Sequence, residues 1–224
     1  MDGVPRHVFS PNQVSLASIE LDPIGWSPSE TTATTRSWSN ESGDLLSLHW
    51  FQTPPDIGAR LGDLAALRAF FRTMVLKNGG GIVSVDVTEV AGVPAVSAVV
   101  KVPQEPHGTT YLASLTLPRR DFSFVIKVQC QESVDVGARE SALYGRFLVG
   151  PAFDPARPLV GWEADPYEPT RRDRVMRNGS EAEEFDAQFP SHPLSRARRA
   201  LASLTRSLRV RDEIARSPAF FGPD

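Results

Sequence analysis

The stretch from Gly80 to Cys130 constrains the fold more than any other part of the chain. It contains four segments rich in Val, Ile, Thr, Phe and Tyr, namely Ile82–Val90, Ala95–Val102, Thr109–Leu117 and Phe122–Cys130. Short runs with Gly, Pro or Asp separate them, and such residues form the tight turns between neighbouring antiparallel strands. In the last two segments apolar side chains alternate with polar ones, which is typical of a sheet covered on one face. The pattern therefore predicts an antiparallel meander.

Helices are expected to cover this sheet, which makes the fold class α+β with the layers of an α/β/α sandwich. Asp63 can cap a helix N-terminus, and apolar residues then recur at helical spacing as far as Val75. Asn78 and the glycines after it end this helix. We predict a second covering helix over about 136–148, and a further strand over Leu45–Phe51.

The character of the sequence changes at Gly150. We expect a core domain over residues 1–150 and a C-terminal extension over 151–224 that packs on it. Residues 151–158 are a proline-punctuated link, and the section as far as 190 has no regular apolar period, so it is either an ordered coil or mobile. Its aromatic residues favour wrapping around the core. The extension should end in a helix at about 193–210, with Ser191 as its N-cap and Pro193 in its first turn.

Charge and cysteine content narrow the classes of function. The net charge is −3, which gives no general attraction to nucleic acid and argues against it as a partner. The single cysteine, Cys130, excludes an internal disulfide and a Cys-based zinc cluster, and suits a reducing compartment. No apolar run approaches the roughly 20 residues that span a bilayer, and no signal-peptide pattern is present. These features predict a cytoplasmic protein without membrane association, and we expect a bacterial one. The excess of arginine over lysine is what the coding bias of a GC-rich genome produces.

No motif indicates catalysis, a cofactor or a metal. Gly79–Gly81 follow a helix and precede a strand, which is the reverse of a phosphate-binding loop, and no Gly-x-Ser-x-Gly elbow exists. The histidines are scattered, with no pair at metal-ligand spacing: His7, His49, His107 and His192. The sequence therefore favours a protein that is not an enzyme, with no catalytic residues, no metal site and no cofactor.

The favoured binding residues are charged groups near the end of the meander. Short connections are expected to place the turn residues Arg119, Arg120 and Asp121 close to Arg139 and Glu140 in the following helix. The guanidinium forks could clamp an acidic peptide or a carboxylate. The alternative is that these groups form salt bridges with one another.

Two further hypotheses use other residues. A small-molecule site or an enzyme pocket between sheet and extension would use polar groups on strands, namely His49, Asp86, Tyr111 and Lys127. A dimerising structural module would pair the apolar stripe of the last helix with a second copy of the chain through Leu194, Leu201, Leu204 and Leu208.

The order strand, helix, four-stranded meander, helix over about Leu45–Leu148 resembles the Mog1/PsbP-like fold. The resemblance is carried by the helix Leu64–Asn78, the turn Val90-Ala91-Gly92-Val93-Pro94-Ala95 and the passage from Phe122 to Leu148. Members of that fold mostly act without catalysis, by binding a small GTPase, supporting photosystem assembly or chaperoning secreted effectors. No residue of a family site matches by position, and the region after Pro151 departs from the fold's pattern. The resemblance implies a protein-interaction, adaptor or chaperone-like module with a protein partner, which is the function that the sequence favours.

Overall fold

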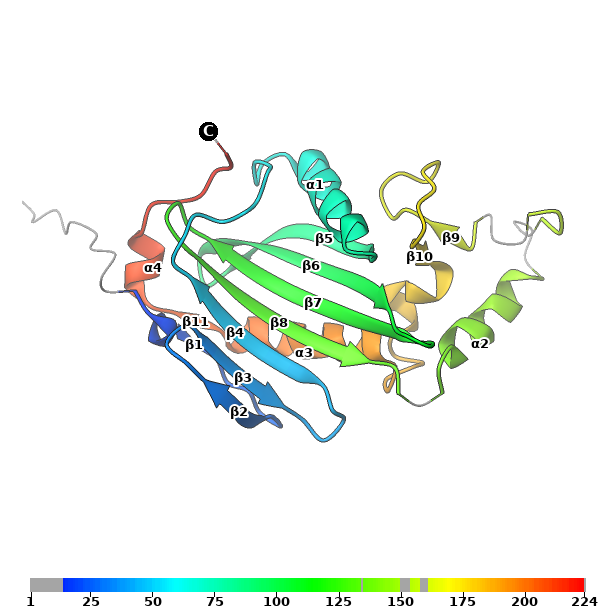
Figure 1. Cartoon of the computed structure of the whole chain (residues 1–224), viewed down its shortest axis with the longest axis horizontal. Helices are drawn as coiled ribbons and strands as arrows, with labels where there is room; N and C mark the ends of the chain where they lie inside the picture. Colours follow the sequence, from blue (N-terminus) through cyan, green and yellow to red (C-terminus); the bar gives the residue numbers. More distant parts are fainter. Residues whose placement is uncertain (1–13, 134, 150–153, 158–160, 224) are drawn as a thin grey trace, which may run out of the picture.

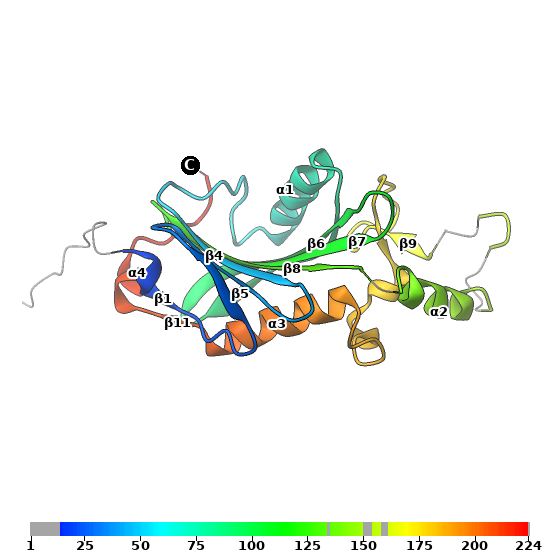
Figure 2. The same ribbon diagram turned by 60° about the horizontal axis from the view of Figure 1, so that its bottom comes forward.

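Seven antiparallel strands form the large sheet of this protein, with one long helix on each face (Figure 1 and Figure 2). The computed structural model describes residues 14–133, 135–149, 154–157 and 161–223. The strand order in the large sheet is β2-β3-β4-β8-β7-β6-β5. The predicted α+β fold class, with an antiparallel meander between helices, is confirmed.

The predicted meander forms four consecutive strands, β5 (Gly81–Val90), β6 (Val93–Pro103), β7 (Thr109–Pro118) and β8 (Ser123–Gln131). Ala91 and Gly92 make the two-residue turn between β5 and β6, and both have positive φ angles, 50° and 77°. Two positive φ angles define the type I′ turn, whose twist matches that of the strands it joins. The local turn chemistry thus sets the register of this hairpin.

Three N-terminal strands widen the sheet beyond β8. These are β2 (Ser27–Thr31), β3 (Thr35–Ser39) and β4 (Leu45–Phe51), of which the sequence predicted only β4. The Ser/Thr-rich segment forms β3 because Trp38, which pairs with Leu46 of β4, packs against the main core. Pro28 lies in β2, at the edge of the sheet. A missing N–H is tolerated at an edge.

The first helix, α1 (Leu64–Lys77), covers only part of one face. Asp63 caps it, because its side chain accepts a hydrogen bond of 3.0 Å from the N–H of Ala66. Leu67, Phe71 and Val75 form a small core with apolar residues of β5 and β6. The other strands on this face lie beyond the helix.

The second covering helix is α3 (Pro193–Ser207), not the helix predicted over 136–148. α3 lies across β7 and β8 on the opposite face from α1 (Figure 2). The helix α2 (Ala138–Phe147) instead extends beyond the end of the sheet and packs on the 3₁₀ turn η3 (Gly179–Glu181). Leu143 is the one apolar side chain that α2 buries, whereas α3 buries a whole stripe. The helix with the longer apolar stripe, α3, therefore packs on the apolar face of the sheet.

The N-cap of α3 is His192, not the predicted Ser191. Because Pro193 is the first residue of the helix, the residue directly before it takes the cap position. The ring Nδ1 of His192 accepts a hydrogen bond of 3.3 Å from the N–H of Leu194.

The chain on either side of α3 is tied to the rest of the molecule. The hairpin of β9 (Glu163–Ala164) and β10 (Arg177–Asn178) is followed by η3 and by η4 (Glu183–Phe185). After α3, β11 (Arg209–Val210) pairs with β1 (Ile19–Glu20), which follows η2 (Leu16–Ser18), and α4 (Asp212–Arg216) ends the regular structure.

Two contacts fix residues 161–173 against α1 and β5. Asp165 accepts two hydrogen bonds from the guanidinium of Arg72, at 2.6 and 2.8 Å, and both side chains are buried. The hydroxyl of Tyr167 bonds to both backbone groups of Val85. His7 and half of the predicted link, residues 151–153 and 158, lie outside the described residues. Within the described part of the chain, no helix has the length and apolar character needed to cross a membrane.

Candidate functional site

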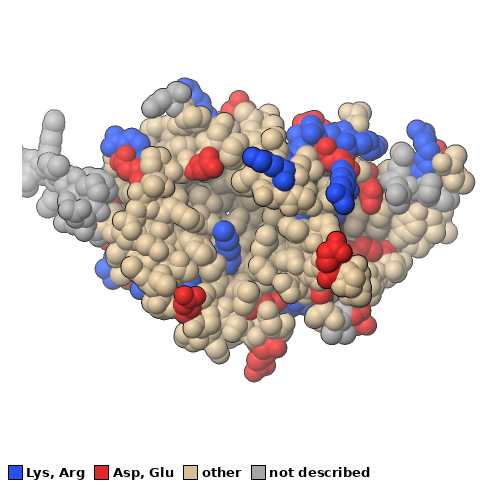
Figure 3. Space-filling view, viewed as in Figure 1, with Lys and Arg blue, Asp and Glu red and all other residues tan. Residues whose placement is uncertain are grey.

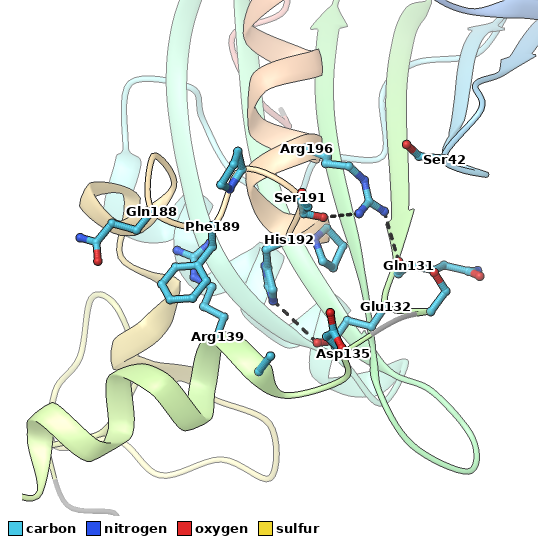
Figure 4. A pocket seen from close by; sticks show the side chains of 14 residues that line it. Ser42, Gln131, Glu132, Asp135, Arg139, Gln188, Phe189, Ser191, His192 and Arg196 are labelled. Atoms are coloured by element: carbon cyan, nitrogen blue, oxygen red, sulfur yellow. Dashed lines mark hydrogen bonds and ion pairs between the residues drawn. The ribbon is translucent and has the colours of Figure 1, made fainter.

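Three elements meet at the end of the sheet from which β8 leaves. Glu132 directly follows β8, Glu140 lies in the first turn of α2, and His192 caps α3. The Nε2 atom of His192 lies 3.7 Å from Oε1 of Glu132 and 3.8 Å from Oε1 of Glu140. We call these three side chains the Glu–His cluster. Figure 4 shows His192 pointing toward Glu132.

The Glu–His cluster is largely buried, and some of its polar atoms have no hydrogen-bond partner. The side chains of His192 and Glu132 are 8% and 6% exposed, and that of Glu140 is 27% exposed. Nε2 of His192 and Oε2 of Glu140 are buried, and neither has a hydrogen-bond partner among the residues that the structure describes. The separations from His192 are too long for hydrogen bonds. One ligand atom from each residue lies within 4.8 Å of the others, so the three could together hold a metal ion.

A cavity of about 550 Å³ opens beside the cluster (Figure 4). Its lining carries groups of both charges, among them Glu132, Asp135, Arg139 and His192. Burial alone would raise the pKa of Glu132. His192 and the N–H of Gly137 lower it by more than burial raises it, so the pKa of Glu132 lies below its usual value. Glu132 is therefore ionised at neutral pH.

A buried set of hydrogen-bonded polar side chains, centred on Glu181, lies next to the Glu–His cluster. Glu181 of η3 is fully buried and accepts hydrogen bonds from Nζ of Lys101 at 2.9 Å and from the Tyr111 hydroxyl at 2.7 Å. The ring of Tyr111 stands edge-on to His192, with 5.5 Å between ring centroids. Burial and the charge of Glu181 raise the pKa of Tyr111, so its hydroxyl keeps its proton and its role as a donor.

Arg139, one of the predicted binding residues, is an internal anchor. Its side chain is fully buried. It donates to the carbonyl oxygens of Ser180 and Ala182 at 2.8 and 3.0 Å. It also donates to Asp186 at 3.0 Å and to Ser195 at 2.8 Å. It therefore joins α2 to the extension and is not presented to a partner.

The other predicted charged residues lie at the opposite end of the sheet from Arg139 and Glu140. Arg119, Arg120 and Asp121 occupy the turn before β8, and that strand of nine residues spans about 30 Å. The expectation that short connections bring all five together is wrong, because β8 lies between them. Arg119 is buried and bonds to the hydroxyl and the carbonyl oxygen of Ser217, whereas Arg120 and Asp121 pair on the surface at 3.0 Å.

The polar residues of the alternative pocket do not converge either. Tyr111 lies on the α3 side of the sheet, whereas His49 and Lys127 lie on the α1 side. Asp86 is bound to Arg68 at 2.5 Å on the outer strand β5. The predicted pocket built from these four residues is therefore not formed.

The leucine stripe of α3 is not available to a second copy. Its members are between 0% and 6% exposed, and all belong to the main core under the sheet, namely Leu194, Leu201, Leu204 and Leu208. Pairing with another chain through them would require α3 to leave the sheet.

The face of the sheet that carries α1 is open over β3, β4, β8 and β7. The strand register aligns three rows of side chains across these strands, and none of the side chains is buried. The rows are Thr35–His49–Val125–Thr116, Ser37–Ser47–Lys127–Ser114 and Ser39–Leu45–Gln129–Leu112. We call these rows the open face. Figure 3 views the molecule from this side, which is hollowed at its middle and carries most of its charged side chains around the rim.

Lys127 stands in the central row and is the only lysine or arginine in the three rows. It forms no hydrogen bond or ion pair with any residue that the structure describes. The neighbouring His49 ring bonds to the hydroxyls of Ser47 at 2.9 Å and Thr35 at 3.3 Å. Burial and the charge of Lys127 lower the pKa of His49. Lys127 is thus the one positive charge of the open face.

Comparisons with known proteins add little to this geometry. No family model matches the chain, and no curated protein matches it. A solved structure from Bacteroides thetaiotaomicron is similar over 60% of this chain and 44% of its own, with 12% identity and a TM-score of 0.33. A protein of unknown function from Pseudomonas aeruginosa is similar over 62% of this chain and 83% of its own, with 14% identity and a TM-score of 0.32.

This chain spans less than half the length of the Bacteroides structure. TM-scores this low carry no functional argument, and the resemblance to the Mog1/PsbP-like fold stays a prediction.

Proposed function

We propose that this protein is a non-catalytic interaction module, of adaptor or chaperone type, that binds a segment of a partner polypeptide on its open face. One observation carries the proposal: the main core covers the α3 side of the sheet, whereas three rows of side chains on its α1 side are not buried. We place this function in the bacterial cytoplasm, on the strength of the composition and the single cysteine.

The dimensions of the open face favour a segment over a globular surface. Four strands about 4.8 Å apart and three rows two residues apart give a patch of about 14 Å by 13 Å. Such a patch is as wide as one helix of about 10 Å, or as two or three extended strands. A standard interface between folded proteins needs about 800 Å² on each partner, several times the area of these rows.

The side chains of the open face define the chemistry of the partner. Six of the twelve side chains in the rows carry hydroxyls and three are aliphatic, and Leu45 and Phe51 of β4 are exposed on this side. Lys127 supplies the central charge. Charge complementarity therefore favours a segment that presents a carboxylate to Lys127 and small or apolar side chains around it.

Photo-crosslinking tests this proposal. A crosslinkable residue replaces Ser114, beside Lys127 on the open face, or Ser203, which is exposed on α3. In native lysate we expect one partner segment with an Asp or Glu to crosslink from position 114 and not from 203. Lys127→Glu should abolish that crosslink, whereas Lys77→Glu, the same charge change on exposed α1 surface, should leave it intact. Equal crosslinking from both positions, or no effect of Lys127→Glu, would contradict the proposal.

A further inference from the structure

We propose that the Glu–His cluster binds one divalent transition-metal ion, of the Zn²⁺ and Mn²⁺ class, through Glu132, Glu140 and His192. This proposal is independent of the open face, which lies on β3, β4, β8 and β7. One imidazole nitrogen with two carboxylates is a donor set that suits zinc, manganese and iron. Magnesium and calcium prefer sites made of oxygen alone, so the imidazole selects against them.

The distances in the cluster are close to those of a formed site. Bonds of about 2.1 Å to one ion place its ligand atoms about 3.0–3.5 Å apart, depending on the coordination geometry. The His192 nitrogen now lies 3.7 and 3.8 Å from the two carboxylate oxygens. Shifts of a few tenths of an ångström would bring the His192 nitrogen to either carboxylate at these separations, and all three ligand atoms already lie within 4.8 Å of one another.

The bonding of the cluster also points to a ligand. Buried polar atoms in proteins nearly always have partners, yet Nε2 of His192 and Oε2 of Glu140 have none among the described residues. In the same part of the chain, His192 is the only group that forms an ion pair with Glu132 or Glu140. Each carboxylate accepts one hydrogen bond, Glu132 from the N–H of Gly137 at 3.2 Å and Glu140 from the Ser180 hydroxyl at 3.3 Å. No lysine or arginine among the described residues neutralises either of them, and a metal cation beside Nε2 of His192 would do so.

Metal binding would change the hydrogen bonding at the start of α3. Nδ1 of His192 accepts the Leu194 N–H, so a neutral ring carries its hydrogen on Nε2. A metal needs the lone pair of Nε2, so the ring must carry its hydrogen on Nδ1 instead, and the contact of 3.3 Å with the Leu194 N–H is given up. The amide of Leu194 therefore reports on ligation by His192.

The surroundings leave coordination positions free for a further ligand. Glu132 and His192 both line the cavity of about 550 Å³, which gives water or a small anion access to the ion. Three protein ligands with an open position are the pattern of reactive zinc sites, whereas structural sites are closed by four. We assign only binding to this site, with no reaction.

Isothermal titration of the full chain, first stripped with a chelator, tests the site with Zn²⁺, Mn²⁺ and Mg²⁺. We expect one Zn²⁺ per chain, with Mg²⁺ binding far more weakly. Glu140→Gln keeps the shape of the side chain and removes its charge. Loss of an outer-shell partner already lowers metal affinity by about 10–100-fold, so loss of this direct ligand should lower it by at least about 100-fold. Glu184→Gln, the same change at an exposed glutamate, should leave affinity unchanged.

His192→Gln should abolish binding, and in the wild type Zn²⁺ should shift the amide resonance of Leu194. Because His192 also caps α3, circular dichroism must show that this variant is folded. If it is not, Glu140→Gln decides the question. Absence of micromolar Zn²⁺ binding, unchanged affinity in Glu140→Gln, or equal affinity for Mg²⁺ would overturn the assignment.

Discussion

Replacement of Glu181 by glutamine should strongly destabilise the protein. The carboxylate is fully buried and satisfied by Lys101, by the Tyr111 hydroxyl and by the N–H of Asn178 at 2.8 Å. Glutamine keeps the shape but turns an N–H₂ group toward one of these donors, and it leaves the Lys101 ammonium, 10% exposed, without its counter-charge. Breaking a buried pair from one side costs about 3–5 kcal/mol.

For a chain of 224 residues, each kcal/mol shifts the melting temperature by about 2–4 °C, so Tm should fall by about 10 °C. Urea unfolding followed by circular dichroism measures the free energy directly. The double variant Lys101→Met/Glu181→Gln removes both charges. Because residues in contact are coupled by about 0.5 kcal/mol or more, its loss of unfolding free energy should be smaller than the sum of the two single losses by at least that amount.

Glu184→Gln is the matched control, since that glutamate is exposed, and it should change the free energy of unfolding by less than about 0.5 kcal/mol. A loss below about 1 kcal/mol in Glu181→Gln, or simple additivity in the double variant, would refute the view that a buried ion pair organises this end of the sheet.

Three further predictions concern other parts of the molecule. Burial and Lys127 hold the pKa of His49 in the folded protein below 6.5. As the pH falls, His49 is therefore protonated in the unfolded chain before it is protonated in the folded one, so the free energy of unfolding should decrease once the pH is below about 6.5. Lys127→Ala should raise the pKa of His49 in an NMR titration, and an unchanged value would be contrary evidence. Asp165→Asn should cost about 3 kcal/mol and speed hydrogen exchange in the segment around it, because it breaks the buried pair with Arg72. Leu201→Ala should cost about 2–5 kcal/mol with no change in mass by light scattering, whereas a halved mass would indicate an interface.

The meander could be predicted because its signals are local. Alternating side chains and the turn residues Ala91 and Gly92 specify strands and register within a few positions of each other. The cover of the sheet could not be predicted in the same way. The helix next to β8 in sequence was the obvious candidate, but α2 buries Leu143 alone among its apolar side chains, whereas the distant α3 carries the full stripe.

The candidate site depended on contacts across the chain. Short connections predict that Arg119 and Arg139 lie close together, yet one intervening strand holds them at opposite ends of the sheet. Glu132, Glu140 and His192 belong to three elements whose meeting depends on where α3 docks. Their spacing matches no local motif, so only the tertiary structure brings them together.

The position of α3 has a consequence for how the protein is made. The sheet is complete once β8 has been synthesised, but the helix that buries its apolar side comes much later in the chain. On the ribosome, Leu46, Phe124 and Ile126 therefore have no cover until Pro193–Ser207 has emerged. A nascent chain that pauses before this point would expose the apolar side of the sheet. We therefore expect ribosome-associated chaperones to bind it, and chains that terminate before α3 to aggregate.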